Sequence, residues 1–226
     1  MRLVIVSIAL LCGSHAFAQV TNEAEAAALR ENVCGSLQNS VGPWDYRTRG
    51  MTSRLRWDHA DNIRNHYDPA IRRMNDGEYS ERVIGDLDFL VRVWPNHVPG
   101  LRALIQYNQA GGKVYRYRTV ECYLERARRF APNDPAVALL EGGFYLRQRE
   151  LERARKSFDA AREMQPDSMD VHYNLGLFYI EAREFDKAVF HAKEAYSLGY
   201  PLPGLKNRLK QLGHWPAEIQ EPSASP

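Results

Sequence analysis

Residues 141–166 read EGGFYLRQRELERARKSFDAAREMQP, and residues 175–201 read LGLFYIEAREFDKAVFHAKEAYSLGYP. The two stretches share one pattern, offset by about 34 residues, of a glycine, an aromatic residue, two alanines and a closing proline. The pattern residues are Gly142, Tyr145, Ala154, Ala161 and Pro166 in the first stretch and Gly176, Tyr179, Ala188, Ala195 and Pro201 in the second. Small residues at these places allow two antiparallel helices to pack side by side. The repeat therefore predicts a stack of helix pairs.

Prolines that follow helix ends set the period along the chain. Pro95, Pro132, Pro166 and Pro201 are 37, 34 and 35 residues apart, and proline suits such points because it cannot continue a helix. We expect helices over residues 64–76, 80–94, 98–110, 115–130, 135–147, 151–164, 168–182 and 185–198. One more amphipathic helix over residues 202–212 is expected to cover the last pair.

From about Arg64 to Leu212 the chain resembles the tetratricopeptide-repeat (TPR) superfamily. The third unit matches best, the fourth has Ala192 where an aromatic is usual, the second has Val120 where alanine is usual, and the first unit is weak. The resemblance implies an all-α fold, a right-handed α-solenoid of about four helix-turn-helix units with a C-terminal capping helix. It also implies a role in contacts between proteins.

We expect the chain to divide into five segments. These are a signal peptide at 1–18, an N-terminal helix and anchored loop at 19–60, the TPR array at 61–202, a capping helix at 203–215 and a disordered tail at 216–226.

The first 18 residues have the features of a secretory signal peptide. Arg2 precedes an apolar run over residues 3–11, and Ala16-Phe17-Ala18 is a small-x-small cleavage site. Cys12 raises the alternative of lipid attachment, but Leu11 precedes it where a small residue is favoured. The run is also shorter than the roughly 20 residues that span a bilayer. We expect cleavage after Ala18 and a periplasmic or secreted protein.

Two cysteines follow the expected cleavage site, Cys34 and Cys122. An exported protein lies where disulfides persist, and an even count fits one bridge between them. The alternative is two buried thiols that act as small apolar side chains.

The charge pattern argues against a nucleic-acid partner. The formal net charge is +2, with Lys and Arg interspersed among Asp and Glu, whereas nucleic-acid binding needs a basic stripe.

The chain also looks like exported bacterial repeat proteins that carry a GP[FWY]DYR-type segment, a DLD-containing helix and a PNH turn. Here these motifs are residues 42–47, 86–88 and 95–97. The likeness supports the fold and the compartment. The aromatic residues Trp44 and Tyr46 favour an anchored loop over the core, with an exposed contact surface as the alternative.

We expect the first helix of each unit to line a concave groove. Its polar and basic part grades into an apolar and aromatic part, which suits a peptide or helix with an apolar segment. The alternative is that Leu205 and Leu209 of the capping helix cover part of the apolar strip. The candidate groove residues are Arg72, Arg102, Gln106, Gln109, Leu139, Gly143, Leu146, Arg147, Tyr173, Leu177, Ile180 and Glu181.

Some members of the superfamily clamp a C-terminal carboxylate with Lys, Asn and Arg side chains. Leu139 and Tyr173 stand at such places here, although Asn174 remains. The departure argues against that clamp.

No catalytic, metal or cofactor motif stands out. His59 and His66 are seven residues apart, without the spacing of a zinc site, and we interpret residues 58–68 as surface and helix-end residues with a turn at Asp68. Asp86 and Asp88 face different sides of a helix, and Asp86 can pair with an arginine such as Arg82. We expect no enzyme, no metal and no cofactor.

The pattern favours an exported adaptor that binds a peptide or helix of an envelope protein in its groove. One alternative is a structural subunit of an envelope or secretion assembly, built through the convex face and the Trp44 loop. A remote alternative is an enzyme that uses Cys34 or His59.

Overall fold

The computed structural model describes residues 33–47, 52–112 and 118–216. The expected signal peptide, its cleavage after Ala18, the helix expected before Val33 and all of the expected tail beyond Pro216 lie outside these ranges.

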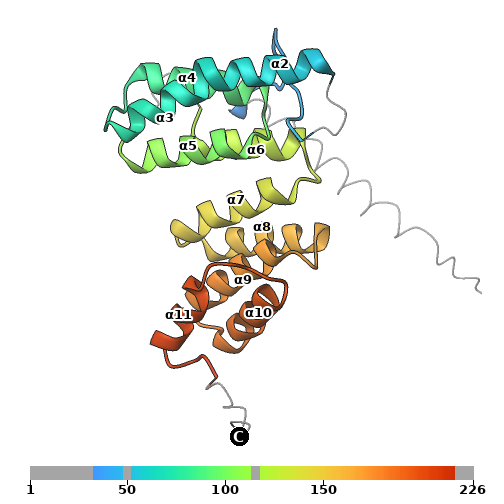
Figure 1. Cartoon of the computed structure of the whole chain (residues 1–226), viewed down its shortest axis with the longest axis vertical. Coiled ribbons are helices and arrows are strands. Elements are labelled where there is room, and N and C mark those ends of the chain that lie inside the picture. The colour runs from blue at the N-terminus through green and yellow to red at the C-terminus, as the bar shows by residue number, and fades with distance from the viewer. Residues whose placement is uncertain (1–32, 48–51, 113–117, 217–226) are drawn as a thin grey trace, which may run out of the picture.

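The described residues form an all-α stack with no strand. Figure 1 shows α2–α6 at one end and α7–α11 at the other. The elements are α2 (Ser53–Asn62), η1 (Ile63–Tyr67), α3 (Asp68–Asn75), α4 (Glu81–Val93), α5 (Val98–Gln109), α6 (Val120–Phe130), α7 (Pro135–Arg147), α8 (Leu151–Met164), α9 (Met169–Glu181), α10 (Phe185–Ser197) and α11 (Gly204–Gln211). Unit 1 comprises α2 to α4, and units 2, 3 and 4 are α5–α6, α7–α8 and α9–α10. The expected solenoid of four units with a capping helix, α11, is confirmed. None of the helices described is both long and apolar enough to cross a membrane.

The first helix of unit 1 begins at Ser53, well before the expected start near residue 64. The Thr52 side chain caps it by accepting a hydrogen bond from the Leu55 backbone N–H. Because α2 buries none of its residues, its sequence lacks the apolar periodicity that predicts a helix. The turn expected at Asp68 is wrong, because the helix continues through Pro69 as the expected helix over residues 64–76 requires. The wider π-helical turn of η1 ends at Tyr67, two residues before this proline, where a ring would strain a regular helix.

The small residues of unit 3 make the close contact that the repeat predicts. A Cβ atom on Gly142 would lie 2.5 Å from the Phe158 ring of α8, and Phe158, Ala154 and Ala161 are fully buried. In unit 4 the nearest neighbour is different. A Cβ atom on Gly176 would lie 2.4 Å from Leu205 of α11 and 3.5 Å from the Ala188 carbonyl of α10. The absence of a side chain at Gly176 therefore makes room for Leu205 of the capping helix, more than for α10 of its own unit.

The described residues of the turn before the last helix of each unit include one in the left-handed region. In units 1 and 2 this residue is Gly77 (φ 80°) and Gly111 (φ 82°), whereas units 3 and 4 use Arg149 (φ 63°) and Arg183 (φ 59°). Glycine adopts such a φ at little cost because it has no Cβ atom, whereas the Cβ atom of arginine is sterically crowded there.

The chain before α2 crosses the second helices of units 1 and 2, and we call residues 34–47 the N-terminal strap. A disulfide joins Cys34 to Cys122 of α6, as expected. The Cys34 carbonyl accepts a hydrogen bond from Arg118 (2.8 Å), and the Gly35 carbonyl accepts from Arg126 (3.0 Å) and Arg129 (2.7 Å). Burial, followed by the charges of Arg118 and Arg129, lowers the pKa of Arg126 to about 10.

The GPWDYR part of the strap reaches the turns that end units 1 and 2. The Trp44 backbone N–H donates to the Val93 carbonyl (2.9 Å), and its ring packs on Trp94 at 5.2 Å between centroids. The amide of Asn96 donates to Asp45 (2.8 Å) and to Asp134 (3.0 Å). Arg47 Nε lies 3.0 Å from the same buried carboxylate of Asp134. The anchored-loop interpretation is therefore confirmed, and the strap ties three consecutive units.

The DLD carboxylates also have structural partners. Asp86 pairs with His66 (2.9 Å) and Arg73 (3.1 Å), across to η1 and α3, instead of with Arg82. Asp88 accepts a hydrogen bond from Tyr123 of α6 (2.7 Å) and pairs with Arg92 (2.7 Å). The two aspartates thus join helices on opposite sides of α4.

Candidate binding sites

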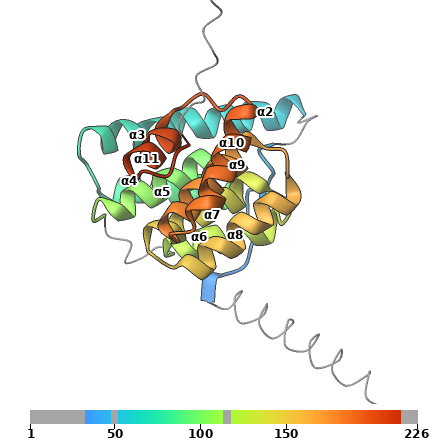
Figure 2. The same ribbon diagram turned by 90° about the horizontal axis from the view of Figure 1, so that it is seen from below.

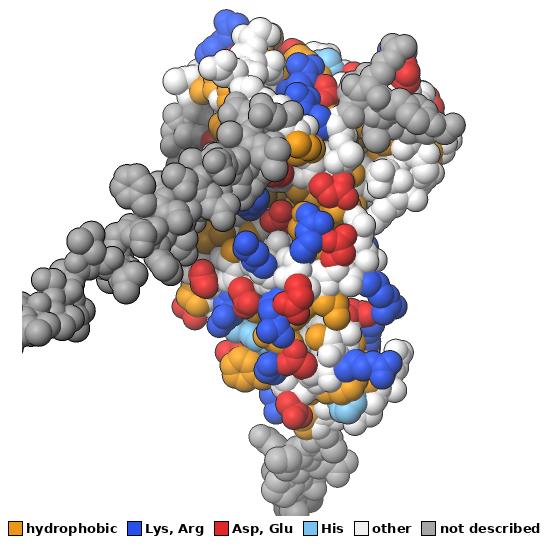
Figure 3. Space-filling view, turned by 180° about the vertical axis from the view of Figure 1, so that it is seen from behind, with side chains coloured by type: hydrophobic (Ala, Val, Ile, Leu, Met, Phe, Trp, Pro, Cys, Tyr) orange, Lys and Arg blue, Asp and Glu red, His pale blue; other side chains and the backbone are white. Residues whose placement is uncertain are grey.

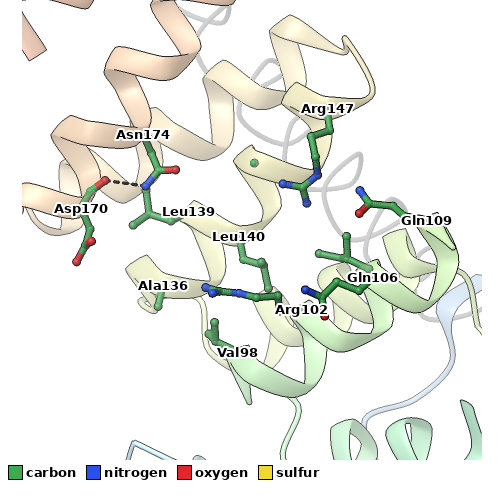
Figure 4. Close-up of a pocket in the computed structure, with 12 residues that line it drawn as sticks. Val98, Arg102, Gln106, Gln109, Ala136, Leu139, Leu140, Arg147, Asp170 and Asn174 are labelled. Atoms are coloured by element: carbon green, nitrogen blue, oxygen red, sulfur yellow. Dashed lines mark hydrogen bonds between the residues drawn. The ribbon is translucent and has the colours of Figure 1, made fainter. Parts of the chain in front are cut away.

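A cavity of about 550 Å³ opens between α5 and α7, with the start of α9 at one end. We call it the front groove. Its apolar wall consists of Val98, Ile105, Ala136, Leu139, Leu140 and the small residue Gly143, and its polar lining consists of Arg102, Gln106, Gln109, Arg147, Asp170 and Asn174. Figure 4 shows the polar side chains of α5 and α7 directed toward the space between these helices. At the α9 end, the Asn174 amide donates to the Asp170 backbone carbonyl (2.8 Å).

Two guanidinium groups give the front groove a positive charge. Arg102 of α5 and Arg147 of α7 line it from facing helices. Burial, followed by the charge of Arg102, lowers the pKa of Arg147, so each cation lies within the electrostatic field of the other. Neither forms an ion pair with any residue that the structure describes. Two like charges that form no ion pair favour an anionic ligand group between α5 and α7, whereas the carboxylate of Asp170 lines the α9 end of the groove.

The structure brings together part of the predicted groove. Arg102, Gln106, Leu139 and Arg147, along with Gln109 and Gly143, all line the front groove. Arg72 does not: it is exposed on α3, outside the lining. Leu146 is also absent from the lining and packs against the core of units 2 and 3.

The apolar part of the predicted groove is covered by the chain itself. Leu205 and Leu209 of α11 are fully buried against Tyr173, Leu177 and Ile180. This outcome matches the alternative in which the capping helix occupies the strip. An ion pair between Arg208 of α11 and Glu181 closes the far end. Tyr173 also stacks on Tyr200 at 3.9 Å between ring centroids.

The histidine cluster does not converge on a metal site. His66 pairs with Asp86, whereas His59 packs among rings and lies 4.9 Å from Trp94 and 5.4 Å from His97 between centroids. Across the described ranges, no three His, Cys, Asp or Glu side chains gather as metal ligands would.

Sequence reasoning missed a second cavity of about 370 Å³ behind the front groove. It lies between α6, α7 and α8, and Glu141 lines it. A signal was present: Val137, Glu141 and Tyr145 recur every four residues on α7, so a carboxylate interrupts an otherwise apolar face.

Figure 3 shows acidic and basic side chains intermixed over the visible described surface of the rear face. No continuous basic stripe appears on this face, in keeping with the charge pattern of the sequence.

No protein-family model matches the chain, and no curated protein matches it. Among solved structures, one described as MamA AMB-1 is similar at 20% identity and a TM-score of 0.42, covering 69% of this chain and 84% of its own. Another, described as a MamA RS-1 ArsTM double mutant, has 20% identity and a TM-score of 0.42, covering 84% of this chain and 96% of its own.

Proposed function

We propose that this chain is an exported adaptor of the TPR type, and that its front groove binds a short peptide segment of an envelope protein. The segment carries an acidic side chain beside an apolar one. The observation that carries the proposal is the pair Arg102 and Arg147, two cations without carboxylate partners in the described residues, directed into one groove.

The lining of the groove supports an extended peptide as the ligand. Leu139 and Leu140 offer an apolar surface, while Gln106, Gln109 and Asn174 supply amide donors and acceptors for a peptide backbone. Since α11 covers the strip on α9, the available groove runs from α5 to α7 and ends at the first turns of α9. A short segment fits this length better than a long helix.

A selection experiment tests this proposal. Peptides from a random library displayed on phage are selected on the protein, and the enriched peptides are synthesised and titrated by fluorescence anisotropy. We expect an acidic residue next to an apolar residue in the enriched set. We also expect Arg102→Glu/Arg147→Glu to weaken binding at least about tenfold, because each lost charge-assisted contact is worth about 1.5–3 kcal/mol.

Arg72→Glu/Arg82→Glu is the matched control. It makes the same change in net charge at two exposed arginines that do not line the groove, and it is expected to bind the peptides like the unmodified protein. Equal losses in both double variants would show only a general charge effect and would contradict the groove. Enriched peptides without acidic residues would also contradict it.

The alternative of a structural subunit built through the Trp44 loop gains no support here. Trp44 packs on Trp94, and Tyr46 packs against His97 at 5.2 Å between ring centroids. Both rings therefore have internal partners.

A further inference from the structure

The second cavity, which we call the rear cavity, lies on the other side of α7 from the front groove. It is enclosed by α6, by the turn at residues 131–134, by α7 and by α8. Its volume of about 370 Å³ falls within the range of small-molecule sites, roughly 300–1,000 Å³. The apolar part of its wall consists of Ala131, Pro132, Val137, Ala138, Ala160 and Met164.

Inside the rear cavity, Glu141 is a buried carboxylate with incomplete partners. Its residue is 7% exposed. One oxygen accepts a hydrogen bond from the Ser157 hydroxyl (3.1 Å), and the other lies 3.7 Å from Arg128 Nε, beyond a normal hydrogen bond. Burial raises the pKa of Glu141 in spite of the nearby cations. A ligand that donates a charged hydrogen bond to this second oxygen would complete the set of partners that a buried carboxylate requires.

The rear cavity also has cations in its lining. Arg128 of α6 has a side chain that is 45% exposed, and it forms a long ion pair with Glu141 at 3.7 Å. Lys156 of α8 is exposed and forms no ion pair within the described part of the chain. Arg153, in contrast, is held by Glu150 (2.7 Å) and by the Tyr145 hydroxyl (2.5 Å). Lys156 is therefore available to an anionic group, whereas Arg128 is held only by its long ion pair with Glu141 and can add a second contact.

We propose that the rear cavity binds a free apolar α-amino acid. The ammonium group donates to Glu141, the carboxylate lies between Arg128 and Lys156, and the apolar side chain packs on Val137, Ala138 and Met164. Asp134 and Arg153 also line the cavity but have partners in Arg47 and Glu150. The remaining buried negative charge, the two exposed positive charges and the apolar wall together complement a small zwitterion with an apolar body. The binding is non-covalent and is independent of the peptide in the front groove.

Isothermal titration calorimetry tests this proposal with the chain from residue 19 to residue 226. The probes are L-alanine, L-valine, L-leucine, L-methionine and L-phenylalanine, each compared with its decarboxylated amine and its deaminated acid. At least one amino acid is expected to bind, and both of its analogues are expected to bind at least about tenfold more weakly, because each lacks one charged contact.

Variants identify the site. Glu141→Gln keeps the shape of the side chain and removes its charge, so we expect at least about a tenfold loss of affinity. Lys156→Ala is exposed and should fold normally, and we expect a loss of several-fold. Arg82→Ala, on α4, is the control and should leave affinity unchanged.

The outcomes that overturn the proposal are distinct. The proposal fails if none of the five amino acids binds, if an amine or acid analogue binds as tightly as its parent, or if Lys156→Ala and Arg82→Ala have the same affinity. Because Lys156→Ala does not disturb a buried group, the test remains decisive even if Glu141→Gln destabilises the fold.

Discussion

Units 1 and 2 differ from units 3 and 4 in what holds them together. Figure 2 shows the units lying over one another along the stack. In unit 3, Gly142 of the repeated pattern packs directly on Phe158, the aromatic residue that unit 4 replaces with Ala192. In units 1 and 2 the strap contributes a disulfide to α6, hydrogen bonds to α4, to α6 and to the turn after α4, and an ion pair to Asp134 in the turn after α6.

This difference shows two ways to stabilise the same architecture. Small residues at fixed spacing stabilise a unit through contacts that are local in sequence. The strap stabilises units that match the pattern poorly, through contacts between residues that are far apart in sequence. The N-terminal half therefore adds a few identifiable long-range bonds to its own hydrophobic core, whereas no strap contact reinforces the core of unit 4 in the described residues.

Among the changes that test this difference, removal of the disulfide should lower the free energy of unfolding the most. Cys34 and Cys122 are 88 residues apart, and loss of such a cross-link typically costs about 2–4 kcal/mol, mostly through the entropy of the unfolded chain. We expect Cys122→Ser to lower the free energy of unfolding by this amount, measured by urea denaturation with the unmodified protein under reducing conditions as a control.

Hydrogen exchange locates the loss caused by Cys122→Ser. Amides of α4 and α6 should exchange faster, whereas those of α8 and α10 should change little. Equally faster amide exchange in all four helices would show that the two halves unfold as one unit. It would contradict the proposed difference in how the two halves are stabilised.

Acid should destabilise both halves through buried histidines. Burial, followed by the charge of His59, lowers the pKa of His97 from 6.5 to about 4. Burial, followed by the charge of His172, does the same for His191. Because the unfolded chain binds these protons first, stability falls as the pH drops from about 6.5 toward 4, by an order of 2 kcal/mol per histidine at pH 5. Thermal unfolding at pH 7 and pH 5 measures this loss.

Asparagine variants separate the two halves in that measurement. His97 Nδ1 accepts the Gly100 N–H (3.0 Å) at the start of α5, and asparagine also caps helices well. In unit 4, His172 donates through Nε2 to the Pro166 carbonyl, so its Nδ1 accepts from His191 (3.0 Å), and an asparagine amide can donate in the same way. His97→Asn and His191→Asn should each remove about half of the acid effect. An unchanged pH dependence in both variants would exclude these histidines as its source.

The smallest expected effect concerns the turn within each unit. Arg149→Gly should stabilise unit 3 by about 0.5–1 kcal/mol, because glycine adopts the observed positive φ without strain. Gly77→Ala should destabilise unit 1 by a similar amount, although nothing lies within 4 Å of its new Cβ atom. Both changes are measured by urea denaturation. A stabilising Gly77→Ala or a destabilising Arg149→Gly would contradict the role of φ at this position.

The sequence predicts the helices of the regular units closely, because each has a full apolar face and clear ends. The expected helices over 135–147 and 151–164 coincide with α7 and α8. It does not predict α2, whose residues are all partly or fully exposed, or the π-helical turn of η1 that precedes Pro69.

The candidate site follows the same rule. Arg102 and Gln106 lie one turn apart on α5, as do Gly143 and Arg147 on α7, so helical spacing alone places each pair on one face. The packing of α11 on Tyr173 and Leu177 is a contact between two separate helices. The periodicity of one helix does not predict such a contact. Periodicity also omits the rear cavity, which requires the relative placement of α6 and α8.

The strap limits where repeat units can be added to this protein. Arrays of this kind lengthen by duplication of whole units. Here the strap has a fixed length and contacts both Cys122 and Asp134, so an inserted unit between them would exceed its reach. An additional unit inserted after Pro166 would meet no such tie, because no strap contact lies beyond the start of unit 3 in the part of the chain that the structure describes. Lineages that gain repeats should therefore gain them downstream of α8.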